Sequence, residues 1–289
     1  MGPTGAGKSD VALAVAERIG AEILSVDSMQ VYRGLDVGTD KPTPEDRSRI
    51  PHHMIDVVDP EDPFTVADFR RQARQVLAKT APRAILLVGG SGLHFRSVVD
   101  PMRFRPYDPS LRAVLGERPL SDLVRELVDA DPTAGRHVDL ANRRRVVRSL
   151  EAYRIGGITP SSWASGPEAQ RYRSYEPELE FVGFGVDRDN IEEAVESRLS
   201  RMWEQGLLEE VERLAPRLGP TASRGVGYRQ LLEVVSGRLT PREGRQSVED
   251  ATMALVKRQR TFFRRDPRLR WIDACSGETV SVIAGAAVA

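Results

Sequence analysis

Near its start the chain reads Gly2-Pro3-Thr4-Gly5-Ala6-Gly7-Lys8-Ser9, which matches the pattern G-x-x-x-x-G-K-[ST]. Glycines in such a loop let successive backbone N–H groups turn toward one anion, because no Cβ stands in the way. Lys8 adds a positive charge, and the Ser9 hydroxyl can bind a phosphate oxygen or Mg²⁺. The apolar run at 11–16 begins a helix whose N-terminus faces the same anion. The pattern therefore predicts a site for a di- or triphosphate over residues 2–9.

A phosphate-binding loop of this kind ordinarily follows a buried strand, and here only Met1 stands before it. We therefore expect either that the start of the gene has been placed too far downstream or that the sheet lacks a central strand, and we favour the first. Reduced stability or activity of the chain is expected in either case.

Length and composition indicate an ordinary globular protein. The 289 residues are 40% hydrophobic and 29% charged, which suits one large α/β domain or a domain with an insertion. No apolar run approaches the ~20 residues that cross a bilayer, so no membrane partner is expected. No signal-peptide pattern is present, because the phosphate-binding loop occupies the N-terminus. Cys275 is the single cysteine, which excludes an internal disulfide and suits the cytoplasm.

The distribution of charge is more informative than its sum, which is zero. Arginines cluster at 143–148, and basic residues cluster again at 257–265. Acidic pairs such as those at 192–193 and 209–210 lie apart from these clusters, so one face can be basic on a neutral protein. Codon bias in a GC-rich genome is the alternative explanation for the abundance of arginine.

Apolar runs and turns predict an α/β fold. Glu22–Val26 is a short buried strand, and Asp27 follows at its carboxyl end, where ligands bind in parallel sheets. The runs at 84–88 and 181–186 are further strands. The first of them ends in a glycine-rich turn around Ser91 without an aspartate, which weakens a plain ATPase interpretation. We predict a P-loop NTPase-like parallel sheet with helices on both faces and a helical insertion domain.

The predicted domain limits follow changes of composition along the chain. Residues 1–104 form the first part of the core, and 105–166, rich in arginine and broken by proline and glycine, form a helical insertion. Residues 167–275 complete the core with C-terminal helices. The small-residue tail at 276–289 is expected to be disordered.

Taken together, the motifs resemble those of the tRNA dimethylallyltransferases, which prenylate the adenosine beside the anticodon. The matching stretches, in order, are Gly2–Ser9, Asp27–Tyr32, Gly38–Pro42, Ile50–Asp56, Gly89–Phe95, Arg143–Tyr153, Gly206–Val211, Arg224–Gln230 and Lys257–Pro267. They cover nearly the whole chain and are much more specific than the phosphate loop alone. The resemblance implies a P-loop α/β fold with a helical insertion. It also implies transfer of a dimethylallyl group from dimethylallyl diphosphate to N6 of adenosine 37, in tRNAs that read codons beginning with U, with release of diphosphate.

The resemblance also implies roles for four catalytic residues. Lys8 and Ser9 would hold the leaving diphosphate together with the rest of the loop at 2–9, and Ser9 would bind Mg²⁺, the expected cofactor. Asp27 would be the general base for N6. The alternative for Asp27 is a Mg²⁺ ligand, which the resemblance disfavours. Arg198 matches a family arginine that contacts the diphosphate.

The other substrate is the anticodon stem-loop of tRNA, whose adenosine must leave its stack to react. By resemblance the residues that contact it are Asp27, Ser28, Met29, Gln30, Ser91, Arg112, Arg144, Arg145, Val146, Val147, Arg148, Arg224, Gly225, Val226, Gly227, Tyr228 and Arg229. For each of these arginines taken singly, a role in a surface salt bridge is as good an explanation as contact with tRNA. Ser91 stands where the family usually has threonine, and His94 replaces a frequent tyrosine. The adjacent pair His52-His53 is interpreted as loop structure and not as a metal site, and the chain is expected to be a monomer.

Three other functions compete with this one. A P-loop small-molecule kinase explains the phosphate loop but not the stretch Asp27–Tyr32 or the basic C-terminal helix. An adenylate isopentenyltransferase, acting on AMP or ATP, shares the loop and the Asp27 region, but the helical insertion favours an RNA substrate. A non-catalytic RNA-binding module is favoured only if the missing first strand disables the site.

Overall fold

The computed structural model describes residues 1–288 and divides into two compact units. Met1–Val98 and the residues from Glu180 onward form one, called here the α/β unit; Val99–Leu179 form the other, the helical unit. The helical unit contains the whole segment 105–166 that the sequence analysis assigned to an insertion, together with residues on both sides of it.

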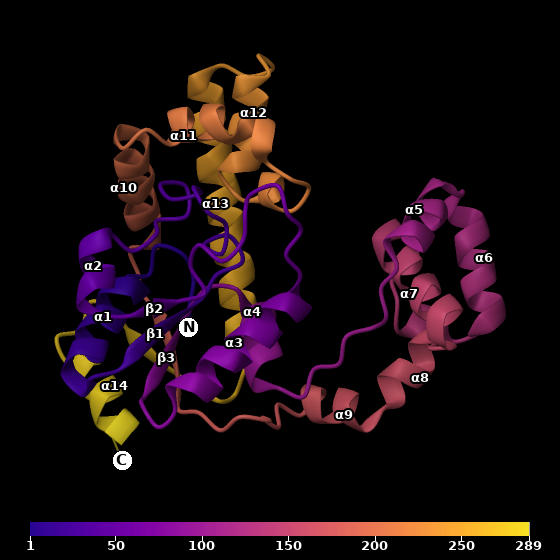
Figure 1. The fold of residues 1–289 in the computed structure, drawn as a ribbon, viewed down its shortest axis with the longest axis horizontal. Helices are drawn as coiled ribbons and strands as arrows, with labels where there is room; N and C mark the ends of the chain where they lie inside the picture. The colour runs from indigo at the N-terminus through magenta and orange to yellow at the C-terminus, as the bar shows by residue number, and fades with distance from the viewer. Residues whose placement is uncertain (289) are drawn as a thin grey trace. The chain divides into compact units, whose positions relative to one another are not determined.

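A three-stranded parallel sheet forms the centre of the α/β unit (Figure 1). β1 (Glu22–Val26) lies between β2 (His52–His53) and β3 (Ile85–Gly89). Helix α1 (Lys8–Ile19) packs against the face that bears Ile23, Leu86 and Val88. Side chains alternate along a strand, so Leu24 and Val26 point to the other face, where both are fully buried. The parallel strands, covered on both faces, confirm the predicted α/β class.

A second parallel pair, β4 (Gly183–Asp187) and β5 (Leu269–Asp273), is linked to this sheet by the first two residues. The Met1 ammonium group donates to the Phe184 carbonyl at 2.8 Å, and the Val186 N–H donates to the Met1 carbonyl at 2.8 Å. On the other side, the Gly2 N–H donates to the Gly89 carbonyl at 3.3 Å. Met1 and Gly2 thus join the end of β3 to β4. The described residues form no strand in this place, which is where a strand before the phosphate loop would lie.

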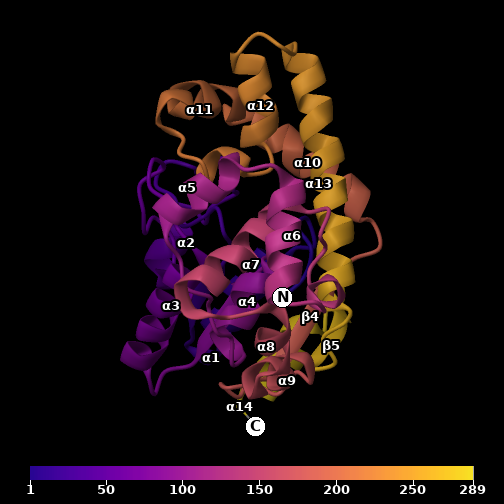
Figure 2. The ribbon, with the colours of Figure 1, turned by 90° about the vertical axis from the view of Figure 1, so that its right-hand side faces the viewer.

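The remaining helices of the α/β unit are α2 (Pro44–Arg49), α3 (Val66–Thr80), α4 (Gly92–Val99), α10 (Ile191–Glu204), α11 (Leu207–Leu214), α12 (Tyr228–Val235), α13 (Pro241–Phe263) and α14 (Thr279–Val288), with 3₁₀ turns at Ala215–Arg217 and Ala222–Arg224. α12 packs against both α11 and the long α13, as both ribbon views show (Figures 1 and 2). No helix in the described part of the chain is long and apolar enough to span a bilayer.

The prediction of a disordered tail at 276–289 is wrong for Thr279–Val288, which form α14, and its last residue lies outside the described residues. This helix packs against α1, with Ala284 buried and the Ser281 hydroxyl accepting a 2.8 Å hydrogen bond from Arg18. The tail's small residues suggested too little apolar surface for packing. Alanine is the best helix former, however, and small side chains let one helix approach another closely.

The helical unit contains α5 (Pro109–Glu117), α6 (Leu120–Ala130), α7 (Arg143–Gly156), α8 (Pro160–Ser165) and α9 (Pro167–Arg173), with a 3₁₀ turn at Ala134–Arg136. Its own hydrophobic core is formed by Leu115, Leu123, Leu127, Ala134, Val138, Val146, Val147 and Leu150. A fully buried carboxylate, Glu151, lies beside this core and accepts hydrogen bonds from Arg112 and Arg148 at 2.5 Å each. Part of the arginine in this segment therefore stabilises the unit itself.

Candidate active site

The phosphate-binding loop has the geometry that its glycines predict. Gly5 and Gly7 adopt φ values of 79° and 80°, a left-handed conformation that glycine tolerates best. α1 starts directly after Gly7, so its N-terminal N–H groups end at the loop. Lys8 and Ser9, the first two residues of α1, line a cavity of about 600 Å³ together with Thr4, Gly5 and Gly7.

Lys8 is the cation at the centre of this loop. Its ammonium group donates a hydrogen bond to the Pro3 carbonyl. Burial and the positive charge of Arg198 lower the pKa of Lys8 to about 8, although the carboxylates of Asp27, Asp187 and Asp40 act to raise it. An anion bound in the loop would stabilise the protonated form, because it would add an opposite charge next to a desolvated one.

Arg198 reaches the same loop from α10. Its Nε donates to Oδ2 of Asp40 at 2.9 Å, and a terminal nitrogen donates to the Thr4 hydroxyl at 2.6 Å. The side chain is only 18% exposed. The structure therefore brings Arg198 next to Lys8 and the loop, and adds Asp40 as a partner that orients the guanidinium group.

Gln259 of α13 fixes the loop from another side. Its side-chain oxygen accepts from the Thr4 N–H at 2.8 Å, and its amide nitrogen donates to the Gly90 carbonyl at 3.0 Å. One amide thus holds both the phosphate-binding loop and the turn after β3. Sequence reasoning placed this residue in a basic cluster and gave it no role.

Asp27 follows β1 directly, at the carboxyl end of the sheet. One carboxylate oxygen accepts a hydrogen bond from the Met29 N–H at 2.8 Å, which fixes its orientation. Asp27 lines the cavity of the phosphate-binding loop and also a second cavity of about 430 Å³. Thr4, Gly90, Arg198 and Gln259 likewise line both. The two cavities therefore meet at Asp27.

The second cavity contains many of the residues predicted to contact RNA. Ser28, Met29, Ser91 and the segment 224–227 line it, along with apolar side chains such as Leu199 and Phe262. The Ser91 hydroxyl accepts from the Ser28 N–H at 3.2 Å, which links the loops after β1 and β3. His94 lines this cavity as well, and burial lowers its pKa to about 4 although the charge of Asp27 acts to raise it. Its ring is therefore neutral near pH 7.

Other residues on the predicted RNA list lie elsewhere. Gln30 lines the first cavity and donates to the Thr39 and Asp40 carbonyls at 3.1 and 3.3 Å. Tyr228 is fully buried, and Arg229 lines neither cavity.

The remaining six belong to the helical unit. The side chains of Val146 and Val147 are buried in its core, so they do not face solvent. Arg112 and Arg148 are held by the buried Glu151, which leaves Arg144 and Arg145 as the exposed pair of the set.

No three histidine, cysteine or acidic side chains among the described residues form a group that could hold a metal ion. His52 and His53 separate, as expected for neighbours on a strand. The His52 ring contacts the Ile50 carbonyl at 2.7 Å, and the His53 ring contacts Glu22 at 2.6 Å. Ser9 lines the first cavity, and its hydroxyl could join the oxygens of a bound phosphate around a metal ion there.

Comparisons with known proteins agree with one another. A family model described as IPP transferase matches residues 30–266. The tRNA dimethylallyltransferase of Bifidobacterium longum is 38% identical over 291 residues, covering 97% of this chain and 87% of the relative. That of Streptomyces coelicolor is 41% identical over 285 residues, covering 94% and 88%. The crystal structure of the tRNA isopentenylpyrophosphate transferase from Bacillus halodurans superposes with a TM-score of 0.70 at 29% identity, covering 99% of this chain and 93% of that one.

Proposed function

The chain belongs to the IPP transferase family and prenylates tRNA, and from this premise we propose that it transfers a dimethylallyl group from dimethylallyl diphosphate to N6 of adenosine 37. That adenosine lies next to the anticodon of tRNAs that read codons beginning with U. The N6–carbon bond forms, the allylic carbon–oxygen bond breaks, diphosphate leaves, and the N6 proton passes to the enzyme.

The phosphate-binding loop is the diphosphate site in this proposal. Of the loop at 2–9, Gly5, Gly7, Lys8 and Ser9 would offer the anion their backbone N–H groups, and Lys8 and Arg198 supply positive charge. Departure of the allylic carbon leaves its bonding electrons on a phosphate oxygen. Cations already placed at that oxygen therefore stabilise the transition state more than the ground state.

Asp27 is the general base in this proposal, and one observation supports it above all: this residue lines both cavities. A donor whose diphosphate occupies the loop and an adenine that enters from the second cavity would therefore meet beside this carboxylate. An exocyclic adenine amine is a weak nucleophile, because its lone pair is delocalised into the ring. A carboxylate that takes its proton during attack makes the amine more reactive.

Magnesium fits the residues of the first cavity. Mg²⁺ prefers oxygen ligands, keeps several waters, and commonly binds through substrate phosphates and one or two protein groups. The Ser9 hydroxyl would hold it, and when bound it neutralises charge on the diphosphate. All other steps of the proposal belong to the chain's own side chains.

The experiment that tests this function uses labelled dimethylallyl diphosphate with tRNA, with AMP, or alone. Label in tRNA only, lost with EDTA and restored by Mg²⁺, supports the proposal. Label in AMP supports an adenylate isopentenyltransferase instead. Transfer that persists in EDTA contradicts the magnesium site while leaving the prenyl transfer intact.

Exposed arginines of the helical unit are proposed to bind the anticodon stem-loop, and the double variant Arg144→Ala/Arg145→Ala tests this. Two lost phosphate contacts are expected to reduce the slope of log K against log salt by about 1.4 to 1.8. Filter binding of tRNA over a salt series measures this slope. The matched control is Arg125→Ala/Arg136→Ala, which removes two exposed arginines of the same unit. An equal loss in both double variants would show a general charge effect and contradict a local contact.

The protein is further proposed to act as a monomer in the cytoplasm. Two features support the cytoplasmic location: the substrate is tRNA, and the single cysteine, Cys275, is exposed and free, as suits a reducing compartment. Light scattering is expected to give the mass of one chain, about 32 kDa.

A further inference from the structure

The loop that carries Asp40 has no regular structure of its own. Residues 35–41 lie between β1 and α2 and form turns and irregular chain. Thr39 and Asp40 line the first cavity, and Asp40 pairs with Arg198 at 2.9 Å. Asp40 has a φ of 53°, a left-handed conformation that is costly for a residue with a Cβ. The surroundings must therefore hold this loop in place.

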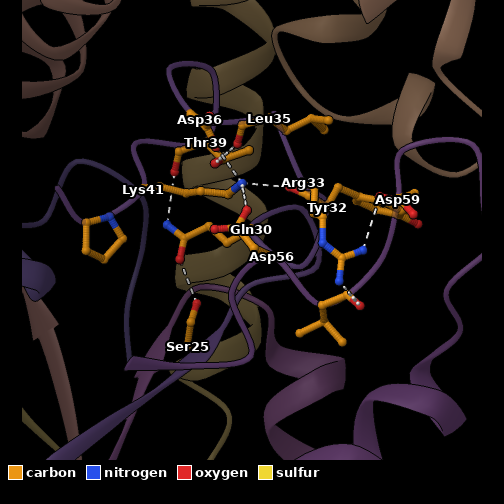
Figure 3. A network of polar contacts seen from close by, with 12 residues as sticks. Ser25, Gln30, Tyr32, Arg33, Leu35, Asp36, Thr39, Lys41, Asp56 and Asp59 are labelled. Carbon is orange, nitrogen blue, oxygen red and sulfur yellow. Dashed lines mark hydrogen bonds and ion pairs between the residues drawn. The ribbon is translucent and has the colours of Figure 1, made fainter. Parts of the chain in front are cut away.

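Lys41 holds one end of the loop, and Figure 3 shows its contacts. Its side chain is only 2% exposed, and the ammonium group donates to the Tyr32 carbonyl at 2.6 Å, to Asp36 at 2.7 Å and to Asp56 at 2.6 Å. Arg47 also pairs with Asp56 at 2.6 Å. Burial acts to raise the pKa of Asp56, but the hydrogen bonds from Lys41 and Arg47 outweigh it and lower that pKa.

Glu210 of α11 holds the middle of the loop. The residue is 5% exposed, and its carboxylate accepts hydrogen bonds from three successive backbone N–H groups, those of Asp36 at 2.9 Å, Val37 at 2.8 Å and Gly38 at 3.0 Å. A buried carboxylate is stable only when such donors compensate its charge. The loop packs so closely at this point that a Cβ on Gly38 would lie 2.6 Å from the Tyr228 hydroxyl.

The fourth donor to Glu210 is that hydroxyl, at 2.6 Å from the carboxylate. Tyr228 is fully buried, and burial together with the charge of Glu210 raises its pKa far above the ordinary value, so it remains a donor. Tyr228 begins α12 directly after Gly227, which lines the second cavity. The Glu210 carboxylate thus contacts both the loop that lines the first cavity and Tyr228, which directly follows the segment 224–227 that lines the second cavity.

We propose that Glu210 is a positioning residue for the transfer reaction, because it fixes the loop that presents Asp40 to Arg198 and ties the segment 224–227 to the same loop through Tyr228. This inference rests on the proposed diphosphate site. It assigns a role to the stretch Gly206–Val211, which the chemistry of the reaction left without one. Without the carboxylate, the strained loop relaxes, Asp40 no longer orients the guanidinium group, and diphosphate binds more weakly.

The variant Glu210→Gln tests the proposal, with inorganic pyrophosphate as the probe. An amide cannot accept all four hydrogen bonds and adds an unpartnered NH₂ group, so we expect the calorimetric Kd for pyrophosphate to rise about tenfold. The KM for dimethylallyl diphosphate is expected to rise by the same factor. Glu209→Gln is the matched control, because Glu209 is the exposed neighbour on the same helix.

A double-mutant cycle separates positioning from general stability. If Glu210 acts through Asp40, the variant Glu210→Gln/Asp40→Asn binds pyrophosphate no more weakly than the weaker-binding of its two single variants. A merely structural role would lower the melting temperature and give effects on Kd that multiply. Multiplying effects, or an unchanged Kd in Glu210→Gln, would overturn the proposal.

A milder variant covers the case in which Glu210→Gln does not fold. Tyr228→Phe removes one of the four donors and leaves the carboxylate in place, and about a two- to threefold rise in Kd is expected. An unchanged Kd would overturn the part of the proposal in which Tyr228 ties the segment 224–227 to the loop. Pyrophosphate binding is measured without turnover. Failure of the transfer assay in the unmodified protein would therefore be distinguished from failure of this inference.

Discussion

Replacing Asp27 by asparagine is expected to lower kcat for prenyl transfer by about 10²- to 10⁴-fold, the usual contribution of a general base. Asparagine has nearly the same shape, and its side-chain oxygen still accepts from the Met29 N–H. It cannot take the N6 proton. The loss is therefore expected in kcat, while the KM values for tRNA and for dimethylallyl diphosphate change by less than about threefold. The rate at which label is transferred to tRNA in a single turnover measures the loss in prenyl transfer.

The control for this variant is Asp62→Asn, which removes an exposed carboxylate that lines neither cavity. It is expected to retain the activity of the unmodified protein. Filter binding of tRNA to Asp27→Asn should also be unaffected. If Asp27→Asn transfers label at nearly the original rate while it binds tRNA normally, Asp27 is not the base.

Replacing Lys8 by alanine is expected to lower kcat/KM for dimethylallyl diphosphate by about 10²- to 10³-fold, similar to the loss of one preorganised donor from an anion site. The lysine charge lies at the loop that would hold the departing oxygen, so its effect is larger in the transition state than in the ground state. Steady-state kinetics at saturating tRNA measure this change. If kcat/KM fell by less than about fivefold, the leaving diphosphate would not be bound at Lys8.

Lys8 also predicts a pH dependence. Since burial and Arg198 lower its pKa to about 8, the free enzyme carries the charge below that pH and loses it as pH rises through 8. The profile of kcat/KM, which reports groups of the free enzyme, is therefore expected to fall above about pH 8. Lys8→Arg keeps its charge at higher pH and should move this descending limb upward. A limb that stays in place in Lys8→Arg would belong to another group.

The parts of the site that depend on local sequence could be predicted. The phosphate-binding loop needs glycines at fixed spacing followed by a helix, and Asp27 needs only to follow a buried strand. Both features are set by neighbours in the chain. The strand at 22–26 and the apolar face of α10 likewise follow from short periodic patterns.

The residues that sequence reasoning missed depend on contacts between distant segments. Asp40 meets Arg198, 158 positions away, and Glu210 meets Asp36, 174 positions away. The sequence around Asp40 or Glu210 contains no motif that would distinguish either residue from a carboxylate exposed to solvent. The stretches Gly38–Pro42 and Gly206–Val211 matched the family, but only the fold shows that they touch. The burial of Val146 and Val147 was missed for a related reason, since their cluster attracted attention through its arginines.

The contacts of Gln259 affect the entropy that is lost when dimethylallyl diphosphate binds. Its single amide is bonded to Thr4 and to Gly90 at once, and it stands on a 23-residue helix. The phosphate-binding loop is thus held in place by a residue from the C-terminal part of the chain, far away in sequence. Little conformational entropy remains to be lost when diphosphate arrives, so more of the intrinsic binding energy is retained as affinity.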